Sequence, residues 1–319
     1  MSAASPRIGI IGTGAIGGYF GLMLARAGFD VHFLLRSEYP AVLENGLQVN
    51  SAVHGTLRLE QPQVYRNAAE MPSCDWLLVA AKSTSNRALA PIITQAAGPG
   101  CKVVLLQNGL AVEDGLRPLL PADVHLLGGL CAIYAHRSAP GVVEHQALGA
   151  VNIGYHSGPA GAAPGQSALL EEIVGMFRSA GVDCSPLPSL EQARWLKLVW
   201  NVPFNGFSAL LDAGTEALLG NPDTREQIRA VMLEVCEAAQ ACGHALPEGL
   251  ADKLLAGTQR MPDYRPSMYH DRMQKRPMEL EAIYAAPLAV AAERGVAMPR
   301  SQLLHGALRF LEAREQARD

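Results

Sequence analysis

The chain has 319 residues, and a chain of this length usually divides into two domains rather than one core. Apolar residues make up 49% of the sequence and charged residues 18%, which is typical of a folded globular protein and excludes a disordered chain. The formal net charge is −4 without a basic stripe, so we expect no nucleic-acid partner.

Membrane insertion, secretion and metal binding find no support in the sequence. No apolar run approaches the ~20 residues that span a bilayer, and "MSAASPRIGIIG" lacks the features of a signal peptide. The six cysteines are scattered without a C-x-x-C pair, and His and Cys never cluster at the spacing of metal ligands. We therefore expect a cytoplasmic protein with reduced thiols, no membrane contact and no metal.

Strand and helix signals alternate in the first half of the chain. "RIGIIG" predicts a first strand, "AIGGYFGLMLARAG" a helix closed by Gly28, and "DVHFLLR" a second strand. Further strands are predicted at "WLLVAAK", "KVVLLQNG" and "VHLLGGLCA". Such apolar strands, separated by helices, indicate a parallel sheet covered on both faces. "GVVEH" and "AVNIGYH" suggest an antiparallel pair near its edge, and "SGPAGAAPGQ" an exposed loop.

The second half shows only helical periodicity after Pro186 and Pro188. The predicted helices cover residues 191–211, 223–242, 247–257, 266–275, 278–294 and 299–316. We therefore predict an α/β domain with a doubly wound sheet over residues 1–188 and an all-α domain over residues 189–319. The apolar helices of the second domain are compatible with a homodimer, but they could equally pack on one another.

A glycine-rich motif directly follows the first strand and opens the first helix. Gly12 permits a tight turn, Gly14 lets the backbone approach a pyrophosphate, and Gly17 allows the helix to pack closely on the strand. The helix N-terminus adds free N–H groups that favour an anion. This context predicts a Rossmann-type dinucleotide site, although a glycine-rich turn without a ligand is the alternative. The expected cofactor contacts are Gly12, Thr13, Gly14, Ala15, Ile16 and Gly17.

Residues at the ends of later strands bear on the cofactor. The second strand ends in Arg36, whose guanidinium suits a 2′-phosphate and favours NADP(H), whereas nearby Glu38 keeps NAD open. Arg36 could also be an ordinary surface arginine. Lys82 and Asn108 close two further strands, where doubly wound sheets bind ligands, although either residue could simply cap a following turn, since Asn-Gly is a favoured turn pair.

The helix expected over residues 191–211 carries Lys197, Asn201 and Asn205 on one face of an otherwise apolar segment. An ordinary solvent-facing stripe would contain better helix formers than asparagine, and Pro203 weakens the helix further. The three polar groups therefore indicate a ligand site in which amides bind a small polar molecule and the lysine donates a proton.

A second polar group of residues lies in "RPSMYHDRMQKRPMELEAI". Pro277 can start a helix and place Glu279 in its first turn, where the helix dipole alone favours a carboxylate. Ser267 could be a helix cap after Pro266. Spacing by itself makes neither residue catalytic.

Taken together, these motifs resemble the ketopantoate reductase (2-dehydropantoate 2-reductase) family over almost the whole chain. The resemblance rests on "GTGAIGG", "QNG" at 107–109 and K-x3-N-x3-N at 197–205. It also includes S-M-x2-D beginning at Ser267 and R-P-x-E ending at Glu279. The order and separation of these motifs match the family.

The resemblance implies NADPH-dependent reduction of a 2-oxo acid, ketopantoate, to pantoate on the route to pantothenate and coenzyme A. It implies a Rossmann domain joined to a helical domain, with the active site in the cleft between them. Lys197 would be the general acid, and Glu279 would orient the nicotinamide end or the substrate hydroxyl and help to position Lys197. The implied substrate ligands are Asn108, Asn201, Asn205 and Ser267, and the implied cofactor ligands are the Gly12–Gly17 loop, Arg36, Lys82, Asn108, Ala135 and Glu279.

Two positions depart from the family pattern on the substrate side. Met278 stands where the family commonly has threonine, and Tyr284-Ala285 replaces a usual Asn-Gly pair. A reductase of another 2-oxo acid, or a 3-hydroxy acid dehydrogenase of similar architecture, therefore stays open. A non-catalytic NADP-binding sensor is a further alternative, which the intact line of Lys197 and the two asparagines argues against.

Overall fold

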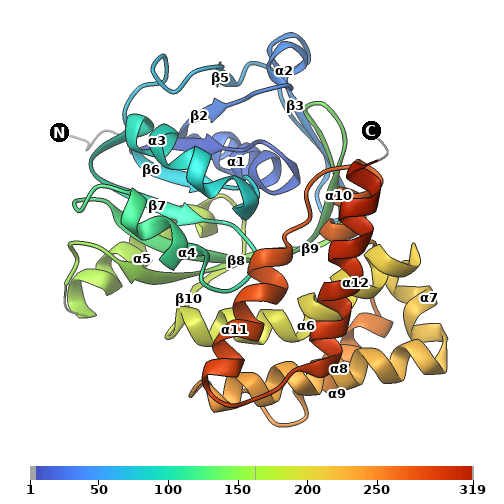
Figure 1. Cartoon of the computed structure of the whole chain (residues 1–319). Helices are drawn as coiled ribbons and strands as arrows, with labels where there is room; N and C mark the ends of the chain where they lie inside the picture. Colours follow the sequence, from blue (N-terminus) through green and yellow to red (C-terminus); the bar gives the residue numbers. More distant parts are fainter. Residues whose placement is uncertain (1–4, 162, 318–319) are drawn as a thin grey trace. The chain divides into compact units, whose positions relative to one another are not determined.

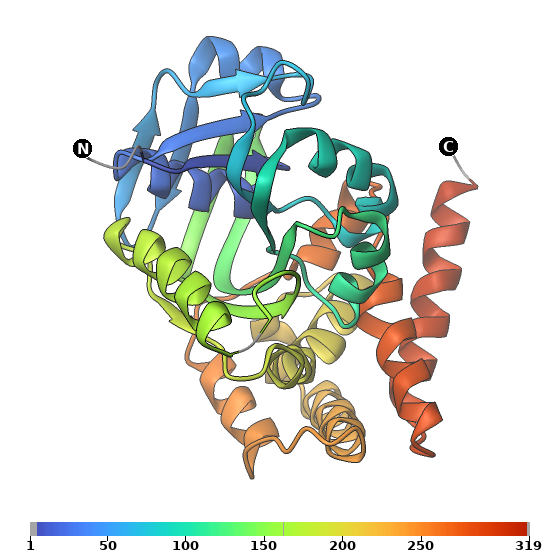
Figure 2. The same ribbon diagram turned by 90° about the vertical axis from the view of Figure 1, so that its left-hand side faces the viewer.

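The computed structural model describes residues 5–161 and 163–317, and the chain forms two compact units. The first comprises the chain up to Gln107 together with Val112–Leu190, and the second comprises Asn108–Ala111 together with the chain from Glu191 onward. Each unit has its own cluster of buried apolar side chains. Figures 1 and 2 show an α/β first unit and a helical second unit, which confirms the predicted fold class.

One mixed sheet of ten strands, counted over the described residues, forms the first unit. In spatial order its main path is β4-β3-β9-β8-β7-β6-β1-β2-β5, and β10 pairs with β9. The segment from β8 to β5 is parallel throughout, and β1 lies between β6 and β2. Chain order therefore reverses beside β1, where doubly wound sheets bind ligands. The strands are β1 Arg7–Ile11, β2 Asp30–Leu34, β3 Leu47–Ser51, β4 Gly55–Leu59, β5 Gln63–Tyr65, β6 Cys74–Val79, β7 Ala97–Leu105, β8 His125–Ala139, β9 Val142–Ser157 and β10 Cys184–Pro186.

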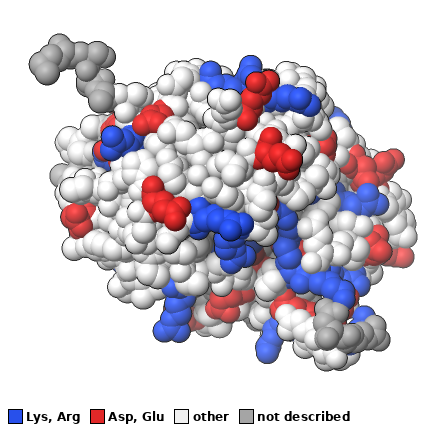
Figure 3. All heavy atoms as spheres, turned by 90° about the horizontal axis from the view of Figure 1, so that it is seen from above, with Lys and Arg blue, Asp and Glu red and all other residues white. Residues whose placement is uncertain are grey.

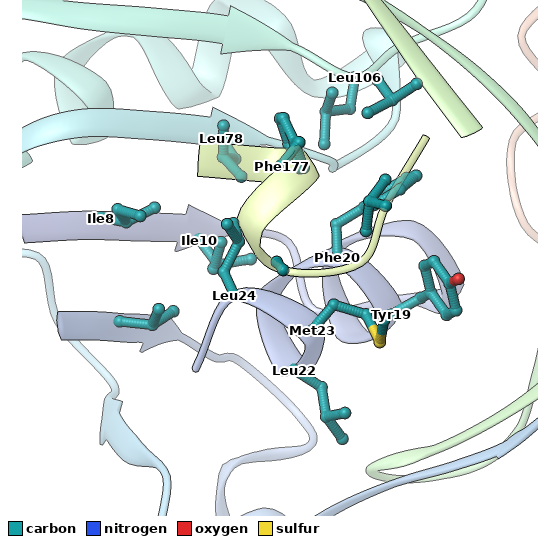
Figure 4. Close-up of a cluster of buried hydrophobic side chains, with 14 of the residues drawn as sticks. Ile8, Ile10, Tyr19, Phe20, Leu22, Met23, Leu24, Leu78, Leu106 and Phe177 are labelled. Atoms are coloured by element: carbon teal, nitrogen blue, oxygen red, sulfur yellow. The ribbon is translucent and has the colours of Figure 1, made fainter. Parts of the chain in front are cut away.

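Helices cover both faces of the parallel segment. Phe20 of α1 and Phe177 of α5 meet edge to face at 5.7 Å between ring centroids and pack over Ile10 of β1 (Figure 4). α3 and α4 lie on the opposite side of the sheet from α5 (Figure 2). This arrangement buries the continuous apolar strands from which the parallel sheet was predicted. The helices are α1 Ala15–Arg26, α2 Tyr39–Asn45, α3 Asn86–Ala96, α4 Val112–Leu116 and α5 Ala163–Ser179, with short 3₁₀ turns at Ser83–Ser85 and Arg117–Leu119.

Two segments of the first unit differ from their sequence predictions. "GVVEH" and "AVNIGYH" form the single strand β9, whose antiparallel partner is β8. Between them Leu148 and Gly149 have positive φ angles of 64° and 123° where the ladder shifts register, so a bulge stands where a turn was expected. In "SGPAGAAPGQ" helix α5 already begins at Ala163, because Pro164 is tolerated in a first helical turn. Ala162 of that stretch lies outside the described residues.

The second unit is built around α8, which contacts α7, α9, α11 and α12. Ile228, Val231 and Val235 of α8 are fully or almost fully buried in its apolar core. The Glu234 carboxylate accepts hydrogen bonds from the backbone N–H groups of Arg300 and Ser301, and so caps α12. The helices are α6 Leu190–Leu211, α7 Thr215–Gly220, α8 Pro222–Ala241, α9 Leu250–Gln259, α10 Ser267–Met273, a π-helical segment Glu281–Ala285 that continues into α11 Ala286–Glu293, and α12 Pro299–Gln316.

Several elements were not predicted or begin elsewhere. The hairpin of β3 and β4, the short strands β5 and β10, and the helices α2 and α7 were not predicted. The helix expected over 278–294 begins only at Leu280, so Pro277 precedes it and does not start it. No helix in the described part of the chain combines the length and apolarity needed to cross a membrane. Figure 3 shows one face of the molecule, on which Lys and Arg side chains are interspersed with Asp and Glu side chains.

Candidate active site

The glycine-rich loop between β1 and α1 is shaped by close backbone contacts. Gly12 has φ of 92°, and a Cβ there would lie 2.5 Å from the backbone N of Ala81. A Cβ on Gly17 would lie 2.1 Å from the carbonyl oxygen of Gly12, whereas one on Gly14 would meet nothing within 4 Å. Packing therefore requires glycine at 12 and 17, and open space lies beside Gly14.

The loop offers hydrogen-bond donors to an anion. Ala15 and Ile16 begin α1, and the first N–H groups of a helix have no partner within the helix. The buried Thr13 hydroxyl has no hydrogen-bond partner among the described residues. No acidic residue stands in the first turn of α1 to occupy these donors. Glycine geometry, free donors and open space together fit a pyrophosphate group.

The two charged residues after β2 have different surroundings. Arg36 is exposed, whereas Glu38 is buried and its Oε1 forms an ion pair with Arg137 near the end of β8. Ala135, on the same strand, is half-buried and pairs in register with His145. Glu38 is the residue that kept NAD possible as the cofactor in the sequence analysis. Its carboxylate is paired with Arg137, a residue that the sequence analysis did not single out.

Lys82 follows β6 in a loop that Gln107 holds in place. The Gln107 side-chain amide donates to the carbonyl of Ala81 at 2.9 Å. It also exchanges two hydrogen bonds with the Asn86 amide, at 2.6 and 3.0 Å. Gln107 is 3% exposed, so these bonds are shielded from water. The "QNG" motif drew attention to Asn108, but its first residue is the one that positions the loop of half-buried Lys82 in this unit.

Asn108 belongs to the second unit, where the turn after it is anchored twice. Gly109 has φ of 103°, and a Cβ there would lie 2.3 Å from the Cβ of Ala282. The N–H of Leu110 donates to the carbonyl of Ala282 at 2.8 Å. The buried Arg194 guanidinium donates to the carbonyl of Gly109 at 3.0 Å. Arg194 was also missed by the sequence analysis, although a charge one turn before Lys197 on an apolar helix was a usable signal.

The polar line on α6 is not a solvent-facing stripe. Lys197 is half-buried, and Asn201 and Asn205 are 5% and 2% exposed. The Asn205 Nδ2 donates to the carbonyl of Asn201 at 3.1 Å, while its Oδ1 accepts from the N–H of Met268 at 3.2 Å and from the Ser267 hydroxyl at 3.4 Å. Asn205 therefore joins the start of α10 to α6.

Asn201 differs from Asn205 in its bonding. Its Nδ2 is buried and has no hydrogen-bond partner among the described residues. A buried amide donor without a partner costs about 1–3 kcal/mol, so its retention is explained if a ligand oxygen accepts from it. Within this unit, the structure thus brings together Asn201, Asn205 and Ser267, as the resemblance implied.

Ser267 and Glu279 occupy other helix positions than the sequence suggested. Ser267 is the first residue of α10 and the cap residue is Pro266, so the helix-cap interpretation of Ser267 is wrong. Glu279 is 3% exposed and lies just before the helix that starts at Leu280, not in its first turn. Its carbonyl accepts from the N–H of Ile283 at 3.1 Å. Across the described residues, no three His, Cys, Asp or Glu side chains are arranged to hold a metal ion.

Comparison with known proteins matches both halves of the chain to one family. A family model described as "Ketopantoate reductase PanE/ApbA" matches residues 8–158, and its C-terminal counterpart matches residues 189–312. The chain is 38% identical to a 2-dehydropantoate 2-reductase of Nostoc sp., an alignment that covers 96% of this chain and 95% of that protein.

Solved structures agree with this result. A 2-dehydropantoate 2-reductase from Geobacter metallireducens superposes with a TM-score of 0.87 at 40% identity, covering 95% of this chain and 99% of that one. D-mandelate dehydrogenase in complex with NADH and anilino(oxo)acetate has a TM-score of 0.83 over 96% of this chain and 98% of its own, but at 20% identity this shows a common fold alone. From the two family models and the 38% identical relative, we conclude that the chain belongs to the ketopantoate reductase family.

Proposed function

We propose that this protein reduces 2-dehydropantoate (ketopantoate) to pantoate with NADPH. The observation that carries the proposal is the buried polar line on α6, where Asn201 presents an amide donor that no described residue uses. Such a donor suits the oxygen atoms of a 2-oxo acid. The names of the relatives from Nostoc sp. and Geobacter metallireducens point to the same substrate.

The first unit would bind the nicotinamide dinucleotide. The loop of Gly12, Thr13, Gly14, Ala15, Ile16 and Gly17 would hold the pyrophosphate through backbone N–H groups and the Thr13 hydroxyl. Arg36 is exposed and would pair with a 2′-phosphate, which favours NADPH over NADH. Lys82 would bind the cofactor from its loop after β6, and Ala135 would line it. The reduced nicotinamide, when bound, supplies the hydride.

The second unit would bind the substrate and supply the proton. Lys197 would donate a proton to the oxygen of the former keto group as the hydride reaches the carbonyl carbon, so that the developing alkoxide becomes the hydroxyl group of the product. Its ammonium would also stabilise the negative charge that develops on that oxygen. Asn201 and Asn205 would hydrogen-bond substrate oxygens, and Ser267 would hydrogen-bond the substrate carboxylate. Asn108 would contact both ligands, and Glu279 would orient the nicotinamide end or the substrate hydroxyl.

Reduction of a different 2-oxo acid is the second candidate, and Tyr284 is the observation that favours it. Its hydroxyl donates to the carbonyl of Val202 at 2.6 Å and lies 2.4 Å from the place that a Cβ on Gly206 would take. The large ring, 1% exposed, therefore fills space against α6 at Val202 and at Gly206, the chain neighbour of Asn205, and it stands where the family usually has asparagine. A change of volume next to a substrate ligand can change which acid fits.

The test is NADPH oxidation, followed by absorbance, with ketopantoate and a panel of other 2-oxo acids. We expect ketopantoate to have the highest kcat/KM, and Lys197→Ala to lower kcat by about 10²- to 10⁴-fold because general acid catalysis is lost. Lys253→Ala is the matched control, since Lys253 is exposed on α9 and its ammonium donates to the Glu248 carbonyl at 3.1 Å. If the protein binds NADPH but does not reduce ketopantoate, its substrate must be a different 2-oxo acid. Full activity of the Lys197→Ala variant would show that Lys197 is not the proton donor. Light scattering on the same preparation tests whether the protein forms the homodimer that the sequence left open.

A further inference from the structure

The ion pair between Glu38 and Arg137 joins parts of the first unit that lie far apart in the sequence. Glu38 precedes α2 just after β2, and Arg137 stands near the end of β8. The Glu38 side chain is 10% exposed and that of Arg137 is 31% exposed. One carboxylate oxygen, Oε1, pairs with the guanidinium, while Oε2 has no hydrogen-bond partner among the described residues. Arg137 is therefore the cation that compensates this largely buried carboxylate.

Glu38 follows the carboxyl end of β2, and two other arginines follow the carboxyl ends of β2 and of its neighbour β5. β2 and β5 are parallel neighbours, with Leu34 opposite Tyr65, and the N–H of Leu35 donates to the carbonyl of Tyr65 at 2.9 Å. Arg36 and Arg66 follow these two strands directly. The Arg66 guanidinium lies over the ring of Tyr39, 4.9 Å from its centroid. The ends of β2 and β5 thus form a positive edge, provided that the charge of Glu38 is neutralised.

A carboxylate at the end of β2 has a defined effect in nucleotide-binding sheets of this type. It holds the ribose hydroxyls of NAD, and it repels the 2′-phosphate of NADP at close range. Both ligands would be expected at this edge of the sheet, since the glycine-rich loop follows the neighbouring strand β1. Whether the negative charge of Glu38 is compensated would therefore influence whether the protein prefers NAD or NADP.

We propose that Arg137 is a positioning residue that sets the preference for a 2′-phosphorylated dinucleotide by engaging Glu38, so that Arg36 meets the phosphate without a competing carboxylate. The inference rests on the proposed function in one respect, because it requires a nicotinamide dinucleotide at the glycine-rich loop. It goes further in assigning cofactor choice to the ion pair between Glu38, just before α2, and Arg137 of β8, and not to Arg36 alone.

Nucleotide binding in the absence of a 2-oxo acid tests the inference. The probes are NADPH and NADH, followed by fluorescence, and adenosine 2′,5′-bisphosphate and AMP, followed by calorimetry. In Arg137→Gln we expect Kd for the two 2′-phosphorylated probes to rise about tenfold, the order of one partly screened charge contact, while Kd for NADH and AMP changes less than about twofold. The double variant Arg137→Gln/Glu38→Gln should regain the preference, because the unpaired carboxylate is gone.

Controls separate the possible failures. Arg7→Gln is the matched control, since Arg7 also pairs with a carboxylate, Asp30, but at the opposite ends of β1 and β2. It should leave all four dissociation constants unchanged. An unchanged preference in Arg137→Gln, or a loss that persists in the double variant, would overturn the inference; the latter result would mean that Arg137 contacts the phosphate itself. Failure of the unaltered protein to bind either dinucleotide would overturn the proposed function as well. Thermal melting verifies that each variant is folded, and Arg137→Lys, which keeps the charge, should retain the preference.

Discussion

The two units contribute to the candidate site in different ways. In the first unit the glycine-rich loop works through its backbone: the space beside Gly14, the close approach of Gly17 to Gly12 and the N–H groups that open α1. In the second unit the site consists of side chains placed along one helix, from Lys197 to Asn205. Backbone donors and missing Cβ atoms create the first site, whereas amide and ammonium groups create the second.

This difference determines how each site should respond to substitution. A backbone site tolerates a new side chain wherever a Cβ finds space, and it fails wherever a Cβ meets another backbone atom. A side-chain site depends on whether each polar group already has a partner in the protein. Stability and ligand binding can therefore be separated within each unit by a matched pair of substitutions.

The largest effect is expected in the loop of the first unit. Gly17→Ala would place a Cβ 2.1 Å from the Gly12 carbonyl oxygen, so α1 must move away from the turn. We expect the free energy of unfolding to fall by about 3 kcal/mol, the upper end for overpacking, as measured by urea denaturation. Gly14→Ala is the matched control: Gly14 has φ of −76° and its Cβ would meet nothing, so stability should be kept while Kd for NADPH rises. Equal destabilisation by both substitutions would contradict the role given to the open space.

A smaller effect on stability separates the two asparagines of the second unit. Asn205→Ala leaves the buried N–H of Met268 without its acceptor, and we expect a loss of about 1–3 kcal/mol in the free energy of unfolding. Asn201→Ala removes an amide donor that has no partner among the described residues, so stability should change little. Instead, kcat/KM for the 2-oxo acid should fall about tenfold or more. Unfolding curves and steady-state kinetics on both variants check this, and a stability loss as large in Asn201→Ala would refute the distinction.

The smallest effect concerns the pH dependence of stability and involves the buried His145 and the half-buried His305. Burial lowers the pKa of His145 in the first unit and of His305 in the second below the usual 6.5. Because the unfolded chain takes up these protons first, the stabilisation is complete above about pH 6.5 and is lost as the pH falls below it. We expect Tm to drop between pH 7.5 and pH 5.5, and His145→Gln to reduce that drop by about 2 °C. A Tm that rises on acidification would show that other groups dominate.

How far the sequence predicts this protein can be seen in α6 and β9. The periodicity of apolar residues predicted α6 to within a residue, because one helix face is buried along its whole length. The same reasoning split β9 in two, because a bulge at Gly149 interrupts alternation just as a turn does. The helix predicted over residues 278–294 includes the π-helical segment before α11, but the periodicity did not indicate its π geometry, and the short helix α7 was not predicted.

The sequence alone determined the alternation of strands and helices in the first half of the chain, the helical second half, the dinucleotide motif and the polar line on α6, because these depend on residues close together in the chain. Only the tertiary structure decided which polar groups have partners. Asn205 meets Met268, 63 residues away, while Asn201 keeps a donor without a partner among the described residues. Glu38 likewise meets Arg137 from a distant strand. Such pairings depend on how helices and strands pack against one another, and a local pattern of residues does not predict this.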